Sequence, residues 1–160
     1  MKKIIILGGG FAGVQAAIEL QKKGIFDVTL VSDRDYLYLF PISIWVPVHK
    51  KEFDDVKVSL AKIQKKYPFQ IIVDKVTGIQ TDENKVICTN HTLSYDYLVI
   101  AFGAEKMTHK GISNTLSICA KPEMSIEIRN KLDDLVQKGN GKIAIGFGGN
   151  PKDKSAVRGG

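Results

Sequence analysis

The sequence is poor in cysteine and histidine and has no long apolar run. Its 160 residues include only Cys88 and Cys119, too few for the disulfide framework of a small secreted domain. No apolar run approaches the roughly 18 to 20 residues that cross a bilayer, and the run before Gly8 is too short for a signal peptide. We therefore expect a cytoplasmic protein, and peripheral contact with the inner membrane surface remains open.

Patterns typical of metal and nucleic-acid binding are also missing. His49, His91 and His109 are far apart and have no spacing typical of metal ligands. The net charge is +6, but the lysine pairs are scattered along the chain and do not form one basic tract. We predict no metal site and no nucleic-acid partner.

The apolar residues instead follow the pattern of an α/β domain. Residues 4–7 form an apolar, β-branched run, which predicts a strand buried on both faces of a parallel sheet. Residues 12–23 have helical spacing and stop at a glycine, and residues 28–31 predict a second buried strand. Together they form a βαβ unit of ordinary length.

The later segments extend this α/β pattern. We predict a packed loop at 36–48, and whether it faces a ligand is left open. Helices are predicted at 54–67 and 122–138, and strands at 97–101 and 142–146. Short β-type runs at 69–73, 76–80 and 86–89 predict a small antiparallel meander. The tail after residue 146 is rich in glycine and charge, so we expect the chain to be a piece of a longer protein.

The first turn carries the strongest functional signal. Gly8, Gly10 and Gly13 form a GxGxxG pattern between the predicted first strand and helix, which is the context that makes this short pattern informative. Gly8 would allow a tight turn, Gly10 a close approach of the backbone to a diphosphate, and Gly13 close packing of helix on strand. Free amides and the helix dipole would then meet the phosphate charge.

A carboxylate follows the second strand at the distance expected for a ribose contact. Asp33 lies 20 residues beyond Gly13, and either Ser32 or Asp33 could contact the ribose hydroxyls. Arg34 beside them leaves open a ribose 2′-phosphate and therefore NADP.

A second motif carries a family resemblance. Residues 96–104 read D-Y-L-V-I-A-F-G-A, which resembles the flavin motif D-Y-L-V-I-A-T-G of the FAD-dependent pyridine nucleotide-disulfide oxidoreductase superfamily. With Phe40-Pro41 and Trp45-Val46 between the two motifs, the chain is most similar to sulfide:quinone oxidoreductases and their flavocytochrome c relatives. The resemblance covers nearly all of this chain but only the N-terminal part of such enzymes.

The resemblance implies a Rossmann-like FAD-binding domain over residues 1–110 and the start of a second nucleotide-binding-like domain over 111–160. It assigns the turn at 101–103 to the cofactor, with Phe102 in place of the usual Thr, and it assigns the backbone of Val76 to the adenine. The predicted FAD-binding residues are Gly8, Gly10, Phe11, Ala12, Gly13, Ser32, Asp33, Val76, Ala101, Phe102 and Gly103.

Cys119 matches the first redox cysteine of sulfide:quinone oxidoreductases, just before the helix that opens at Pro122. A thiol near a helix N-terminus can gain thiolate character, although a buried inert cysteine is the alternative. The family's next cysteine is not found where it would fall, since Ala156-Val157-Arg158 stands there. We interpret Cys88 as structural.

The resemblance implies an FAD-dependent oxidoreductase that passes two electrons from a reduced donor, sulfide or NADH, to an acceptor such as a quinone. A sulfide:quinone oxidoreductase is preferred because the stretch 146–151 does not open an apolar helix as a second nucleotide turn would. An NADH:quinone oxidoreductase and a non-catalytic nucleotide-binding or redox-sensing module remain alternatives, and homo-oligomerisation is left open.

Overall fold

The computed structural model of the chain describes residues 1–104, 111–119 and 121–146. The chain forms two compact units: the first comprises Met1–Ile42 and Glu52–Glu105, and the second comprises Ser43–Lys51 and Lys106–Gly160. The second unit therefore takes in a short segment from within the sequence of the first. A division into domains at residue 110 stays a prediction.

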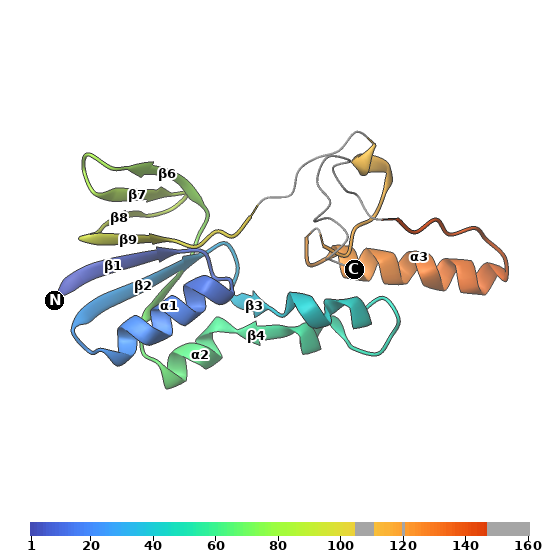
Figure 1. Cartoon of the computed structure of the whole chain (residues 1–160), viewed down its shortest axis with the longest axis horizontal. Coiled ribbons are helices and arrows are strands. Elements are labelled where there is room, and N and C mark those ends of the chain that lie inside the picture. The colour runs from blue at the N-terminus through green and yellow to red at the C-terminus, as the bar shows by residue number, and fades with distance from the viewer. Residues whose placement is uncertain (105–110, 120, 147–160) are drawn as a thin grey trace. The chain divides into compact units, whose positions relative to one another are not determined.

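A four-stranded parallel sheet forms the centre of the first unit (Figure 1). Its strand order is β5-β2-β1-β9, and the strands are β1 (Lys2–Leu7), β2 (Phe26–Ser32), β5 (Gln70–Val73) and β9 (Tyr97–Ile100). Every neighbouring pair is parallel. The predicted Rossmann-like α/β class with a parallel central sheet is confirmed.

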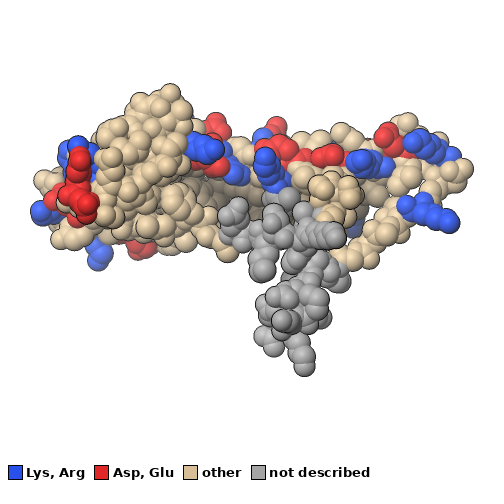
Figure 2. Space-filling view, turned by 90° about the horizontal axis from the view of Figure 1, so that it is seen from above, with Lys and Arg blue, Asp and Glu red and all other residues tan. Residues whose placement is uncertain are grey.

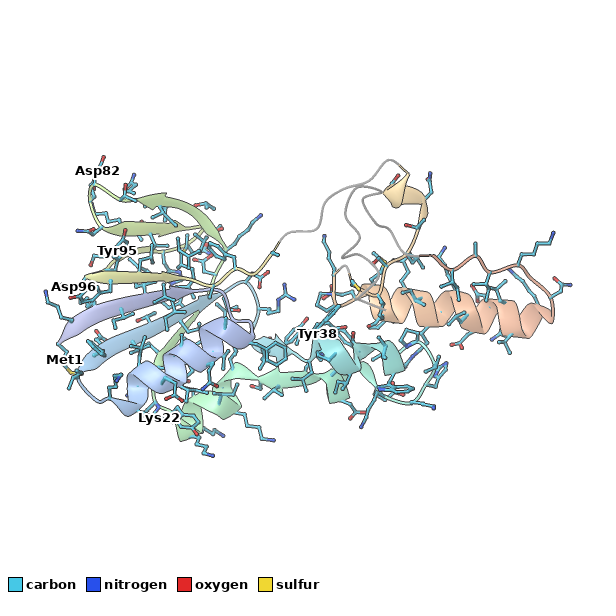
Figure 3. All side chains as sticks on the ribbon, viewed as in Figure 1. Met1, Lys22, Tyr38, Asp82, Tyr95 and Asp96 are labelled. Carbon is cyan, nitrogen blue, oxygen red and sulfur yellow. The ribbon has the colours of Figure 1, made fainter. Side chains whose placement is uncertain are left out.

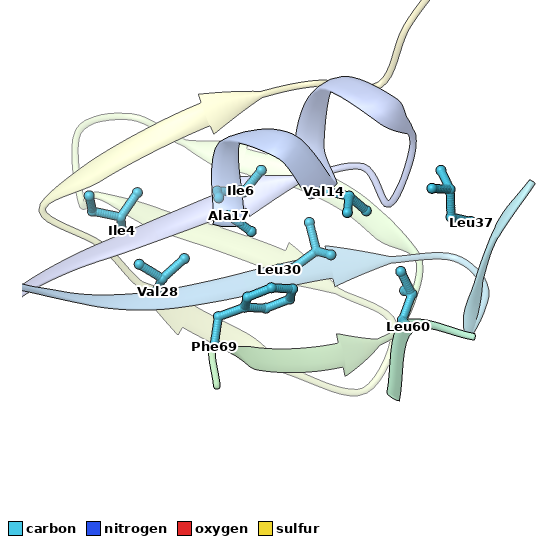
Figure 4. Packing of buried hydrophobic residues seen from close by; sticks show 9 residues of the cluster. All are labelled: Ile4, Ile6, Val14, Ala17, Val28, Leu30, Leu37, Leu60 and Phe69. Carbon is cyan, nitrogen blue, oxygen red and sulfur yellow. The ribbon is translucent and has the colours of Figure 1, made fainter. Parts of the chain in front are cut away.

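Both faces of this sheet are covered, which explains why its strands read as continuous apolar runs. Ile4 and Ile6 face the helical side, where they pack with Val14 and Ala17 of helix α1 (Phe11–Lys22) (Figure 4). Ile5, Leu7 and Val31 face the opposite side, where they pack against a second sheet. The first unit thus has three layers, with α1 and α2 (Leu60–Lys66) on one side of the parallel sheet (Figure 1).

The second sheet is the predicted antiparallel meander. It has the order β6-β7-β8, with β6 (Val76–Gln80), β7 (Lys85–Cys88) and β8 (Thr92–Ser94). The run at 69–73 was wrongly predicted to belong to it. That run forms β5 in the parallel sheet, because Phe69 is buried in the helical-side core and Gln70–Val73 pairs with β2.

The prediction of one long helix at 54–67 is also wrong, because a short 3₁₀ helix and a short strand take up its first part. Glu52 and Asp55 form a capping box that closes a short 3₁₀ helix at Phe53–Val56. Lys57–Ser59 then forms β4, which pairs antiparallel with β3 (Tyr36–Tyr38), and α2 begins only at Leu60. The predicted loop at 36–48 accordingly contains β3 and a 3₁₀ helix at Phe40–Trp45.

The second unit is built on helix α3 (Met124–Lys138), which follows a 3₁₀ turn at Ile112–Asn114 and ends at Gly139 in the left-handed conformation with φ 68°. Arg129 donates from Nε to the carbonyl of Val46 at 2.7 Å and from Nη2 to that of Lys51 at 2.5 Å. These bonds hold the segment Ser43–Lys51 on α3. Residues 142–146 form no strand, contrary to prediction.

Candidate functional site

The carboxyl ends of β1, β2 and β9 open into a cavity of about 600 Å³ in the first unit. This is the edge of an open α/β sheet at which ligands bind. The cavity is lined by Gly8, Gly9, Gly10, Phe11, Ala12, Val31, Ser32, Asp33, Arg34, Tyr36, Tyr38, Asp74, Lys75, Val76, Ala101, Phe102 and Gly103. The structure thus brings the predicted cofactor residues together around one space, with Gly13 immediately behind them.

The three motif glycines occupy different environments. Gly8 has φ +111°, and a side chain there would overlap the backbone of Ala101. A Cβ on Gly13 would overlap the carbonyl oxygen of Gly8, so this glycine permits the close packing of α1 on the turn. A Cβ on Gly10 would meet nothing within 4 Å. Gly8 and Gly13 therefore build the turn, whereas Gly10 borders open space in the cavity.

The turn also presents unpaired main-chain donors. The N–H of Gly8 is used, since it donates to the carbonyl of Val31 at 2.8 Å. Helix α1 begins after Gly10 with no side-chain cap and no acidic residue in its first turn. Its first N–H groups, at Phe11, Ala12 and Gly13, therefore have no helical or capping acceptor and carry the positive end of the helix dipole. This arrangement suits an anion in the cavity.

Ser32 and Asp33 lie at the end of β2, as predicted, and differ in exposure. Ser32 is buried, and its Oγ accepts a hydrogen bond from the backbone N–H of Arg34 at 3.3 Å. Asp33 is exposed and receives the Arg34 guanidinium in a bidentate pair, Nε and Nη2 each 2.9 Å from a carboxylate oxygen. The Arg34 guanidinium lowers the pKa of the Asp33 carboxyl. An ion pair of balanced charge therefore borders the cavity here.

The turn after β9 forms the wall beside the glycines. The backbone N–H of Ala101 donates to the carbonyl of Leu7 at 2.8 Å, which continues the sheet ladder by one residue. Gly103 has φ +76°, so the chain leaves the cavity through a left-handed residue. Phe11 and Phe102 are 54% and 57% exposed and place two aromatic rings at the cavity.

Our list of predicted FAD-binding residues did not include several residues that line the cavity, among them Tyr36, Tyr38, Asp74 and Lys75. Tyr36 and Tyr38 lie on β3, in a segment that has no clean sequence period and was therefore assigned to a loop. Asp74 and Lys75 lie in the two-residue connection between β5 and β6. Assigning β5 to the parallel sheet would have placed this connection at the ligand-binding edge.

Cys88 is not among the residues that line the cavity. Cys119 belongs to the second unit and is half-buried, and its backbone N–H donates to Ser117 Oγ at 3.3 Å. Cys88 is buried on β7, where burial raises the pKa of its thiol. The loop after residue 146, where we discounted a second nucleotide turn and looked for a partner cysteine, lies outside the described residues.

Membrane and metal features can be assessed over the described residues alone. Within them, no helix combines the length and apolarity that a bilayer crossing requires. No group of three or more His, Cys, Asp or Glu side chains in this part of the chain could hold a metal ion. Acidic and basic side chains are interspersed on the face seen in Figure 2.

A parallel sheet, a glycine turn and an uncapped helix N-terminus around one cavity are typical of the dinucleotide-binding class of α/β folds. Residues 2–150 match the family described as pyridine nucleotide-disulphide oxidoreductase. The chain belongs to that family.

A sulfide-quinone enzyme is among the most similar proteins. The chain is 32% identical over 153 residues to sulfide-quinone reductase from Aquifex aeolicus (strain VF5), covering 91% of this chain and 34% of the relative. The solved sulfide:quinone oxidoreductase from Aquifex aeolicus superposes with a TM-score of 0.78 at 30% identity, over 86% of this chain and 33% of that one.

NADH enzymes are similar as well. A type II NADH:quinone oxidoreductase from Staphylococcus haemolyticus (strain JCSC1435) is 27% identical, over 99% of this chain and 40% of the relative. NDH2 from Plasmodium falciparum superposes with a TM-score of 0.74 at 26% identity, over 89% of this chain and 31% of that one. The chain thus spans about a third of the length of these relatives.

Proposed function

We propose that the cavity of the first unit binds the ADP half of FAD. The observation that carries this proposal is the uncapped start of α1 beside Gly10, where unpaired amides and open space border the same cavity. A diphosphate supplies the negative charge that these amides and the helix dipole favour. The fit requires no cationic side chain, because the donors are main-chain groups.

The residues at the end of β2 support a ribose with free hydroxyls. Ser32 and the Asp33 carboxylate lie next to the glycine turn, and a carboxylate can accept hydrogen bonds from ribose hydroxyls. Because the Arg34 guanidinium is paired with Asp33, the local charge is balanced rather than positive. This arrangement disfavours a ribose 2′-phosphate and therefore the NADP alternative.

We further propose that the whole protein is an FAD-dependent oxidoreductase similar to sulfide:quinone oxidoreductase. FAD held there would supply two-electron transfer from a reduced donor to an acceptor such as a quinone. In this proposal, the glycine turn and the end of β2 anchor the cofactor, and Cys119 is the candidate residue for reaction with a sulfur donor. Because quinones are lipids, peripheral contact with the membrane accompanies the proposal.

NADH as the donor is the second candidate. The similarity to type II NADH:quinone oxidoreductases favours it, and these relatives share the same part of the chain. The first unit supports both donors equally, because its cavity is assigned to the flavin. A non-catalytic nucleotide-binding module would share the cavity without any electron acceptor.

The test is an absorbance scan of the full-length protein before and after addition of sulfide and, separately, NADH. We expect a flavin band that sulfide bleaches and NADH does not. Bleaching by NADH alone would replace the sulfide proposal with the NADH alternative. A flavin band that neither donor changes, but that dithionite bleaches, would exclude both donors, and a flat spectrum throughout would contradict FAD binding.

In a parallel test, Cys119→Ser should abolish bleaching by sulfide and leave bleaching by dithionite unchanged, with Cys88→Ser as the matched control. An unchanged response to sulfide in Cys119→Ser would remove this cysteine from the proposed chemistry.

A further inference from the structure

A nearly inaccessible carboxylate, that of Asp74, belongs to the lining of the cavity. The Asp74 side chain is 2% exposed. Its oxygens accept hydrogen bonds from the backbone N–H of Lys75 at 2.8 Å, the backbone N–H of Asn90 at 2.9 Å and the side-chain amide of Asn90 at 3.3 Å. His91 Nδ1 lies 2.6 Å from Asp74 Oδ2 and donates to it when it carries a proton.

The backbone around Asp74 connects three parts of the first unit. The N–H of Asp74 donates to the carbonyl of Ser32 at 2.8 Å, at the end of β2. The carbonyl of Lys75 accepts from the N–H of Thr89 at 2.9 Å, next to the β7–β8 turn. Both main-chain polar groups of Lys75 are therefore occupied, and the segment Lys75–Val76 is fixed on both sides.

This fixed segment is itself part of the cavity lining, whereas Asn90 and His91 are not. The side-chain bonds of the network thus act on the cavity through the connection between β5 and β6, since the bond to Ser32 is made by the backbone of Asp74. Partners that lie behind a site in this way orient the groups in front of them. The glycine turn has a separate support, because Gly8 bonds to Val31 and Gly13 packs on Gly8.

We propose that Asp74, together with Asn90 and His91, is a positioning residue that holds the Lys75–Val76 wall against the adenosine part of the bound dinucleotide. The inference rests on the proposed function, and it assigns the two ends of the ADP half to two independent supports. The diphosphate depends on the glycine turn, and the adenosine depends on the Asp74 network.

The separation of these supports makes the inference testable with two ligands. ADP contacts both supports, whereas inorganic diphosphate contacts the glycine turn alone. We would titrate both ligands into the apo form of the full-length protein by calorimetry, in the wild type, Asp74→Ala, His91→Ala and Asp82→Ala. Asp82 is the matched control, because it is an exposed aspartate in the β6–β7 turn, at the outer tip of the same antiparallel sheet (Figure 3).

Asp74→Ala should weaken ADP binding roughly tenfold, since losing hydrogen bonds to a charged group can account for such a change, and should leave diphosphate binding within a factor of about two. His91→Ala removes one donor and should weaken ADP binding by about threefold. Asp82→Ala should match the wild type with both ligands.

The outcomes separate this inference from the proposed function. If the wild type binds neither ADP nor FAD, the proposed function fails and the inference fails with it. If the wild type binds ADP but Asp74→Ala leaves its affinity unchanged, or weakens ADP and diphosphate equally, the positioning role is overturned and the proposed function stands. If Asp74→Ala does not fold, the same comparison of ligands in His91→Ala decides.

Discussion

Each unit of the chain is stabilised internally by a different kind of interaction. In the first unit, apolar layers on both faces of a parallel sheet form the interior, and the cavity is shaped by backbone. In the second unit, the buried apolar residues among those described are Val46, Pro47 and Pro122. Helix α3 is tied to Ser43–Lys51 by the hydrogen bonds of Arg129 and by the contact of Asp133 with His49. The first unit therefore has a core that fixes its site, while the second depends on particular side chains.

The largest effect is expected at Gly13, where the backbone of the first unit shapes the turn. Gly13→Val should lower the free energy of unfolding by about 3 kcal/mol, because the new side chain would overlap the carbonyl of Gly8 at the base of the turn. Urea unfolding measures this change. Gly78→Ala is the control, since a Cβ there meets only Ile87, and it should shift stability by no more than about 0.5 kcal/mol. Similar stability in both variants would contradict the steric account of the turn.

In the second unit, loss of the Arg129 side chain should have a comparable effect on stability. Arg129→Met retains the apolar stem but loses the bonds to the carbonyls of Val46 and Lys51, which should cost about 2 kcal/mol of local stability. Hydrogen exchange of the amides in Ser43–Lys51 should then accelerate. Lys131→Met, an exposed change on the same helix, should leave that exchange unchanged. Equal exchange in the two variants would show that Arg129 does not hold the segment.

The same difference explains what could be predicted from the sequence. Strands β1 and β2 were predictable because burial on both faces makes them continuous apolar runs, whereas the run that forms β5 was assigned to the wrong sheet. The glycine turn was predictable because sterics restrict Gly8 and Gly13 to glycine. The segment 53–66 was not, because a capping box and a short pairing with β3 override its helical period. Asp74 was missed because its partners, Asn90 and His91, are distant in sequence.

Acid should weaken the first unit through Asp96. Its carboxylate accepts from Lys2 Nζ and from the N–H of Lys3, each at 2.7 Å, and the Lys2 hydrogen bond lowers the pKa of this carboxyl. The stabilisation is present above the unfolded pKa near 3.8 and is lost as the pH falls through the lower folded pKa. The urea concentration at the midpoint of unfolding should therefore decrease as the pH is lowered below 4. This decrease should be less steep in Asp96→Asn. Parallel pH profiles would contradict this role.

The two units should also differ in the rate at which their cysteines are alkylated, although this difference is smaller than the effects on stability. Iodoacetamide should modify half-buried Cys119 before Cys88 in the native protein, because burial raises the pKa of the Cys88 thiol and shields it. Mass spectrometry of digested protein would follow each site, and the rates should converge in urea. Faster modification of Cys88 in the native state would mean that the antiparallel sheet does not protect β7.

Gly10→Ala tests the central claim most directly, because this glycine borders the cavity without supporting the turn. A methyl group there meets no protein atom within 4 Å, so the free energy of unfolding should change by no more than about 1 kcal/mol. Affinity for FAD, measured by titration of the full-length apoprotein, should fall at least tenfold, since the methyl group would occupy the place of the diphosphate. An FAD affinity equal to that of the wild type would contradict the account.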